Sequence, residues 1–187
     1  MSKILKLNIE LEYTGVWREI FIESDRTFHE LHKVLQTIFE WENYHLREFA
    51  VSRKKSIGPD NREEIIPGRS RLDEKDIELS EFLKSAGDSI DYMYDFGDGW
   101  KHRIEVKDIL TNDEIEEYDE LPAVIDGEKK APPEDCGGPP GYERVLEAYN
   151  NPEDVEHEEL LDWLDDDFDP EEFDIESMNE ILAEECK

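Results

Sequence analysis

The sequence predicts an α+β fold in which a mixed or antiparallel β-sheet is packed by one main helix. This arrangement is similar to a β-grasp core, and an acidic helical extension follows it. Two observations lead to this expectation. Several segments in the first 110 residues alternate apolar and polar residues with a period of two, which is typical of strands with one solvated face. Apolar residues also recur at helical spacing, once in this first part and in three stripes nearer the C-terminus.

We expect the 187 residues to form a single domain. Its parts are a β-rich core over residues 1–110, an acidic and Pro-rich connector over 111–135, and an acidic helical extension over 136–187. The apolar stripes of the extension are Tyr142, Val145, Leu146 and Tyr149, then Leu160, Leu161 and Leu164, then Ile175, Met178, Ile181 and Leu182. Each stripe needs a surface to bury it, so the extension is expected to dock on the core.

The N-terminal elements follow from these periodicities. Residues 5–13 and 16–23 fit two strands of a hairpin joined by a Thr-Gly turn. Thr27 and Glu30 form the signature of a capping box, and a helix with an apolar stripe follows over residues 28–39. We expect this helix to pack on the sheet.

The middle of the chain predicts a third strand and a second hairpin. Residues 45–53 fit a strand, and the stretch over 58–68, which is rich in Gly and Pro, is expected to be loop. A short helix around residues 80–86 should end at the glycine that follows. Residues 90–96 and 100–106 alternate on either side of a Gly-Asp-Gly loop, which predicts the hairpin.

Negative charge is concentrated in the second part of the chain. Residues 111–187 hold 29 Asp and Glu against 4 Lys and Arg, a net charge of −25, whereas residues 1–110 hold 23 against 17, a net charge of −6. Nucleic-acid affinity depends mainly on cations that neutralise phosphates, so this balance disfavours direct DNA binding. It favours a basic protein partner, or an acidic face that only keeps the protein soluble.

The sequence carries no visible signal for secretion or membrane insertion. The alternating N-terminus lacks the apolar stretch of a signal peptide, and no run approaches the roughly 20 apolar residues of a membrane span. The two cysteines, Cys136 and Cys186, form no disulfide framework, which fits a reducing compartment. We expect a soluble cytoplasmic protein with no membrane contact, and the sequence leaves its oligomeric state open.

Two segments combine side chains of unusual chemistry, namely YDFGDGWKH over residues 94–102 and PPEDCGGPPGYE over 132–143. Shorter motifs accompany them, at Leu31-His32, Trp41, His45-Leu46 with Phe49, and Phe173-Asp174. In this combination the sequence resembles the plasmid pRiA ORF-3-like family over most of its length. The resemblance implies no particular activity, because the family has none that is settled. Arg47 stands where members often have a second histidine, so a site that needs that imidazole is not expected.

Members of that family are sometimes labelled TnpR resolvases, and the residues argue against this function. A serine recombinase needs a nucleophilic serine among arginines that clamp phosphate, together with a basic DNA-binding region. The first strand contains no such segment, and the C-terminal part has the opposite charge. We therefore reject the label.

The two segments, together with Trp41 and the start of the third strand, define a candidate functional surface. It consists of Trp41, His45, Asp95, Asp98, Trp100, His102, Glu134, Asp135, Cys136 and Tyr142. Its His, Asp, Glu and Cys side chains are ligand types for a divalent metal, but the paired spacing of structural zinc sites is missing. His102 shares a strand face with apolar residues, so we expect a hydrogen-bonded histidine in the core or at an edge. Asp98 is expected to cap its own turn.

A nucleophilic role for Cys136 is disfavoured by its neighbours. Attack requires the thiolate, and the carboxylates of Glu134 and Asp135 oppose its formation. The glycines beside the cysteine indicate a tight, closely packed turn instead. Carboxylate pairs such as Asp95 with Asp98 assign no catalysis, because a chain with 52 acidic residues contains many such pairs by chance.

The leading hypothesis is a non-enzymatic binding or adaptor module with no predicted cofactor. Its two distinctive loops would meet at one end of the sheet, and its acidic helices would face a basic protein partner. The alternative is a metal-assisted hydrolase or transferase that uses a divalent metal and the His, Asp and Cys residues of the two segments. A further hypothesis is a DNA mimic, whose carboxylates occupy a basic groove of another protein.

Overall fold

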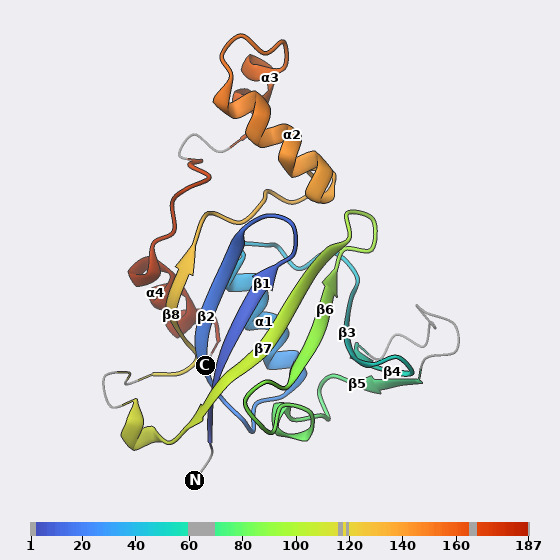
Figure 1. Ribbon diagram of the computed structural model, residues 1–187, viewed down its shortest axis with the longest axis vertical. Helices are drawn as coiled ribbons and strands as arrows, with labels where there is room; N and C mark the ends of the chain where they lie inside the picture. The colour runs from blue at the N-terminus through green and yellow to red at the C-terminus, as the bar shows by residue number, and fades with distance from the viewer. Residues whose placement is uncertain (1–2, 60–69, 116–117, 119, 165–167, 187) are drawn as a thin grey trace.

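A single large sheet dominates the computed structural model, which describes residues 3–59, 70–115, 118, 120–164 and 168–186 (Figure 1). Its eight strands lie in the order β5-β4-β3-β6-β7-β1-β2-β8. The strands are β1 (Ile4–Leu11), β2 (Val16–Glu23), β3 (Arg47–Ser52), β4 (Lys55–Gly58), β5 (Ser70–Asp73), β6 (Ser89–Tyr94), β7 (Trp100–Leu110) and β8 (Ala123–Glu128). Neighbouring strands are antiparallel except for β4 and β5, so the sheet is mixed.

Helices complete the described structure and confirm an α+β fold. The four α-helices are α1 (Phe28–Ile38), α2 (Gly138–Asn150), α3 (His157–Trp163) and α4 (Ile175–Glu185). Two short 3-10 turns are η1 (Leu79–Glu81) and η2 (Asn112–Glu114). None of the described helices is long and apolar enough to cross a lipid bilayer.

The main core lies between α1 and one face of the sheet. Alternate residues of β1, including Leu7 and Ile9, are fully buried on this face, and α1 contributes Leu31 and Leu35 to the same cluster. Figure 1 shows α1 crossing the sheet behind its central strands. Burial of the two apolar surfaces against each other explains why the helix takes this position.

The opposite face of the central strands is polar. Lys6 of β1 pairs with Glu19 of β2 at 2.8 Å, and Arg103 of β7 pairs with Asp91 of β6 at 3.0 Å. Such a face matches the period-two alternation in the sequence, in which every second side chain points to solvent.

Both hairpins and the first helix form where the sequence predicts them. β1 pairs with β2, β6 pairs with β7, and Thr27 and Glu30 make the reciprocal hydrogen bonds of a capping box. The loop of the second hairpin is longer than expected, because β6 ends at Tyr94 and Asp95 adopts a left-handed backbone with φ of +51°. Phe96 therefore lies outside the strand and is partly exposed.

Three local predictions are wrong. The stretch expected to be loop begins with part of β4, and β5 pairs with β4 in parallel, while residues 60–69 lie outside the described residues. The short helix expected around residues 80–86 is reduced to the turn η1. The segment expected to be a connector, 111–135, contributes β8, which extends the sheet beyond β2. β4 and β5 have only four residues each, which is too short a periodic signal to be distinguished from loop, and β8 is recognised by its pairing with β2.

The helices of the acidic extension take two different positions. α4 packs against α1 and β8, where the Asn179 side chain accepts from the Val124 backbone N–H at 2.7 Å and donates to its carbonyl at 2.9 Å. α2 and α3 lie beyond the end of the sheet, at the top of Figure 1. The likeness to a β-grasp core stays a prediction.

Candidate functional site

Three segments that are far apart in the sequence meet at one end of the sheet. They are the segment before β3 (residues 39–46), the β6–β7 loop (95–99) and the segment that leads into α2 (129–137). Figure 1 shows the β6–β7 loop close to the start of α2. The Trp41 indole N–H donates to the Pro132 carbonyl at 2.9 Å. The Tyr94 hydroxyl donates to a carboxylate oxygen of Glu134 at 2.6 Å. The segments that carry the sequence-predicted residues are thus joined by direct hydrogen bonds.

His45 lies at the centre of this junction, between two carboxylates. Its Nδ1 is 3.6 Å from Oδ2 of Asp95, and its Nε2 is 3.3 Å from Oδ1 of Asp135. One donor atom from each of the three residues lies within 4.8 Å of the others. The structure therefore brings three of the predicted residues together.

Each of these two carboxylates is held in place by its other oxygen. Oδ1 of Asp95 accepts from the backbone N–H of Gly97 at 2.8 Å, and Oδ2 of Asp135 accepts from the Tyr44 hydroxyl at 2.9 Å. The oxygens that remain face the imidazole. Tyr44 is absent from the sequence-predicted set, and its position between Trp41 and His45 is the only signal that could have identified it.

Buried aromatic rings support the site from below. Trp41 stacks on Tyr94 with ring centroids 5.0 Å apart and planes 15° apart, and Trp100 lies 5.9 Å from Trp41. All three rings are buried. Trp41 and Trp100, which are predicted as surface residues, therefore fix the loops that carry the site and do not face solvent.

His102 belongs to the core and not to the group around His45. It is fully buried among the rings of Phe39, Trp41 and Tyr92. The predicted core position of His102 is therefore confirmed. Neither ring nitrogen has a well-directed hydrogen bond to a described residue, but the backbone of Tyr92 and of Trp100 interacts with the ring, so its hydrogen bonding stays a prediction. Burial lowers the pKa of His102 to about 3, because the effect of burial is larger than the opposite effect of nearby backbone carbonyls. The imidazole is therefore neutral at neutral pH.

Cys136 and Tyr142 present no reactive group. Burial, together with the negative charge of Asp98, raises the pKa of the Cys136 thiol to about 12. Such a thiol is protonated at neutral pH and is a poor nucleophile. Tyr142 is buried, and burial likewise raises its pKa to about 12.

Asp98 connects the β6–β7 loop to the start of α2. Its Oδ2 accepts from the backbone N–H of Gly137 at 3.1 Å, so it does not cap its own turn as predicted, and Asp95 takes that role. A Cβ on Gly138 would collide with the Asp98 carbonyl oxygen. The glycines of the second motif therefore allow two backbone segments to approach closely.

The Gly138→Ala variant is expected to lose about 2–4 kcal/mol of unfolding free energy, because it adds a steric clash to the strain of an alanine at φ +71°. Gly137→Ala is the matched control. Its φ is +95°, but the nearest atom to an added Cβ is 3.6 Å away, so only the strain of about 1–2 kcal/mol applies. Urea unfolding of both variants measures the difference. Equal losses would show that the close approach at Gly138 does not matter.

Comparison with known protein families matches residues 3–177 of the chain to the family of plasmid pRiA4b ORF-3-like proteins. The chain belongs to this family. The resemblance inferred from the motifs is thereby confirmed.

Two relatives of this ORF-3-like chain have no stated activity. The uncharacterized protein y4hQ of Sinorhizobium fredii is 32% identical over 169 residues, which cover 87% of this chain and 81% of the relative. The crystal structure of a protein of unknown function, MM3350 from Methanosarcina mazei Go1, matches with a TM-score of 0.82 at 34% identity and covers 95% of this chain and 98% of that one. Function must therefore be argued from the site.

The trailing Phe-Asp motif of this ORF-3-like protein has a structural role. The Phe173 ring lies 3.5 Å from the guanidinium carbon of Arg18, a fully buried residue whose nitrogens donate to four backbone carbonyls. Gly127 leaves room for this ring, because a Cβ there would come within 2.6 Å of it. Asp174 accepts two backbone N–H groups at the start of α4. The motif thus anchors the extension to the end of β8.

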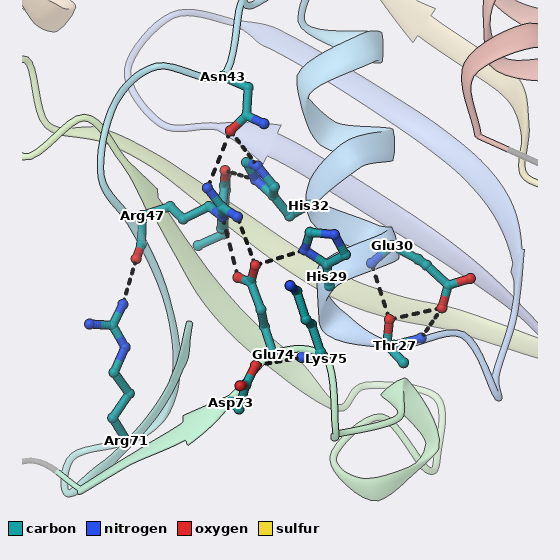
Figure 2. A network of polar contacts seen from close by, with 11 residues as sticks. Thr27, His29, Glu30, His32, Asn43, Arg47, Arg71, Asp73, Glu74 and Lys75 are labelled. Carbon is teal, nitrogen blue, oxygen red and sulfur yellow. Dashed lines mark hydrogen bonds and ion pairs between the residues drawn. The ribbon is translucent and has the colours of Figure 1, made fainter. Parts of the chain in front are cut away.

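Figure 2 shows a buried polar network beneath the segment before β3. Glu74 binds Arg47 through two hydrogen bonds of 2.7 and 3.2 Å and contacts His29 Nδ1 at 2.8 Å. His32 of the Leu-His motif contacts Oδ1 of Asn43 at 2.7 Å, and Arg47 donates to the same oxygen at 3.2 Å. The network fixes the backbone that leads to His45, and it gives Arg47 a structural role.

Proposed function

We propose that this protein is a binding module that engages a basic partner protein through α2, α3 and the adjoining acidic surface. The pairing of its few cations carries this proposal. In the described part of residues 111–187, each basic side chain already has a carboxylate partner: Lys129 pairs with Glu171 at 3.5 Å, Lys130 with Glu40 at 3.3 Å, and Arg144 with Asp154 at 2.7 Å. The described carboxylates of this segment far outnumber these cations, so a strong negative field remains for a partner.

Exposed apolar side chains on the same surface support the proposal. Leu161 is 44% exposed and Trp163 is 49% exposed, and both belong to α3, of which no residue within 157–163 is buried. Large apolar side chains surrounded by charges are typical of anchor residues in protein interfaces. We infer that α3 supplies the anchor and that the carboxylates around it guide a basic partner into place.

A groove between α2 and α3 gives the partner a specific place to bind. Val145, Leu160 and Trp163 contribute apolar surface to this groove, and Asp135 lies at its edge. Its occupant would be a basic segment that inserts at least one apolar side chain. The cations of such a segment would pair with the carboxylates around the groove, and its apolar side chain would cover the apolar surface inside it.

The test is photocrosslinking in the cells that produce the protein, with a photoreactive amino acid in place of Trp163. We expect a discrete crosslinked partner with a basic surface. With the purified partner, the dissociation constant should rise at least tenfold, on the order of 1.4 kcal/mol, when the salt concentration increases from about 0.05 M to about 0.5 M.

Two variants define the interface in the same binding assay. Leu161→Ser should weaken the complex by about tenfold or more, because it removes an apolar anchor without changing charge. Lys107→Ala, on the polar face of the sheet, should leave the affinity unchanged. A partner whose affinity depends neither on salt nor on Leu161 would contradict the proposal.

A further inference from the structure

His45, Asp95 and Asp135 form a cluster of potential metal ligands that sequence spacing alone does not reveal. Among the described residues, this is the one group of at least three His, Cys, Asp or Glu side chains whose donor atoms all lie within 4.8 Å of one another. The three residues come from the segment before β3, the β6–β7 loop and the segment that leads into α2. Only the packing of these segments at the end of the sheet brings them together.

The spacing of the donors fits a coordination shell. Ligands held about 2.1 Å from a tetrahedral ion lie about 3.4 Å apart, and ligands on opposite sides of an octahedral ion lie about 4.2 Å apart. The 3.3 Å between His45 Nε2 and the Asp135 oxygen falls at the first of these values. The three donors lie within 4.8 Å of one another, so a pair at that limit would have to approach by about 0.6 Å to reach the octahedral separation and by about 1.4 Å to reach the tetrahedral one.

These contacts are not an ordinary hydrogen-bonded ion pair. Nε2 of His45 is enclosed and has no hydrogen-bond partner among the described residues, since its contact with Asp135 is not well directed. The 3.6 Å between Nδ1 and Asp95 exceeds a hydrogen-bond distance. At the same time, Gly97 and Tyr44 hold the outer oxygens of the two carboxylates. The inner oxygens are therefore oriented toward the imidazole but are not satisfied by it.

The net charge of the cluster also favours a bound cation. Asp95 is only 8% exposed, and among the described residues its one ion pair is with His45. Two carboxylates face a single imidazole, so the group carries net negative charge in either protonation state of the histidine. Asp95 is a buried carboxylate and needs a compensating charge, which a divalent cation supplies, whereas the Asp135 side chain is 62% exposed and would bind the same ion from the solvent side.

We propose that His45, Asp95 and Asp135 bind one divalent first-row transition-metal ion through one imidazole nitrogen and two carboxylate oxygens. This set of donors contains no thiolate and suits Zn²⁺ or Mn²⁺, with Zn²⁺ bound more tightly. Three protein ligands leave coordination positions open to water or to an anionic ligand, as in catalytic metal sites. The inference concerns the end of the sheet, but Asp135 also lines the groove between α2 and α3. The metal site is therefore tested with the purified chain and metal ions alone, without any partner protein.

Equilibrium dialysis of the full chain, stripped of metal with a chelator, tests the site with Zn²⁺ and separately with Mn²⁺. Weak binding of divalent ions to other carboxylates is suppressed by about 0.15 M salt and an excess of Mg²⁺. We expect one Zn²⁺ per chain under these conditions. His45→Gln, Asp95→Asn and Asp135→Asn should each weaken binding by at least about tenfold.

Asp91→Asn is the matched control, because it removes a carboxylate from β6, the strand that leads into the same loop, but not from the cluster, and its affinity for Zn²⁺ should equal that of the unchanged chain. Circular dichroism of each metal-free variant shows whether it is folded. The absorption spectrum of bound Co²⁺ should change in His45→Gln and stay the same in Asp91→Asn. Absence of stoichiometric binding, or affinity that is equal in all variants, would overturn the proposal.

Discussion

The Glu74→Gln variant is expected to lose about 3–5 kcal/mol of unfolding free energy. Glu74 is 1% exposed, and its carboxylate binds Arg47 and His29. Burial raises the pKa of Glu74, but the hydrogen bonds from Arg47 and His29 outweigh this effect and lower the pKa overall. The substitution therefore leaves the Arg47 guanidinium, which is 14% exposed, without a carboxylate partner among the described residues.

Urea unfolding at neutral pH measures this loss, and Asp91→Asn serves as its control. Asp91 pairs with Arg103 at 3.0 Å on the solvated face of the sheet, where an ion pair contributes less than about 1 kcal/mol. If both substitutions cost the same, the network in Figure 2 adds no stability beyond that of a surface pair. The Zn²⁺ affinity of Glu74→Gln should also fall if the network positions the segment that carries His45.

As the pH is lowered, the fold is expected to lose stability already at pH values well above those at which carboxylates titrate. Burial lowers the pKa of both His32 and His102 to about 3, from 6.5 in the unfolded chain. Between these values the unfolded state binds more protons than the folded state, so the unfolding free energy falls as the pH falls. From about pH 7 to about pH 5 the two histidines together should remove about 4 kcal/mol.

The His102→Leu variant tests this sign and this cause. Its unfolding free energy should decrease with falling pH about half as steeply as that of the unchanged chain, because only His32 still contributes. The comparison uses slopes, so any constant cost of the new side chain does not affect it. Restricting the measurement to about pH 5 and above excludes Glu74, whose lowered pKa removes stability only at more acidic pH. Identical slopes in both proteins would show that His102 is not the cause.

The sequence predicted those parts of the fold that depend on local patterns. The capping box at Thr27 and the two hairpins are set by residues within a few positions of one another, and all three are present. The edge strands β5 and β8 were missed because each is defined by its pairing with another strand. β8 also contains Gly127, which leaves room for the Phe173 ring. A glycine inside a strand weakens the sequence signal for that strand.

The site was predictable as a set of residues but not as a geometry. The motifs placed His45 and His102 in the same candidate surface, yet only His45 lies between carboxylates, while His102 is enclosed by aromatic rings. Asp98 shows the same limit, since its carboxylate holds the neighbouring segment through Gly137 and leaves its own turn to Asp95. In each case the residue type fixes what a side chain can do, and its neighbours across the fold decide what it does.

By itself the sequence determined the family, the sheet with its covering helix and the uneven charge, because these depend on motifs, on periodicity and on composition. Only the tertiary structure decided that His45, Asp95 and Asp135 converge and that the cations in the described part of the acidic segment are already paired. The physical reason is that distances between segments far apart in the chain follow from how the sheet ends and how the segment before α2 packs against that end. No local pattern encodes those distances.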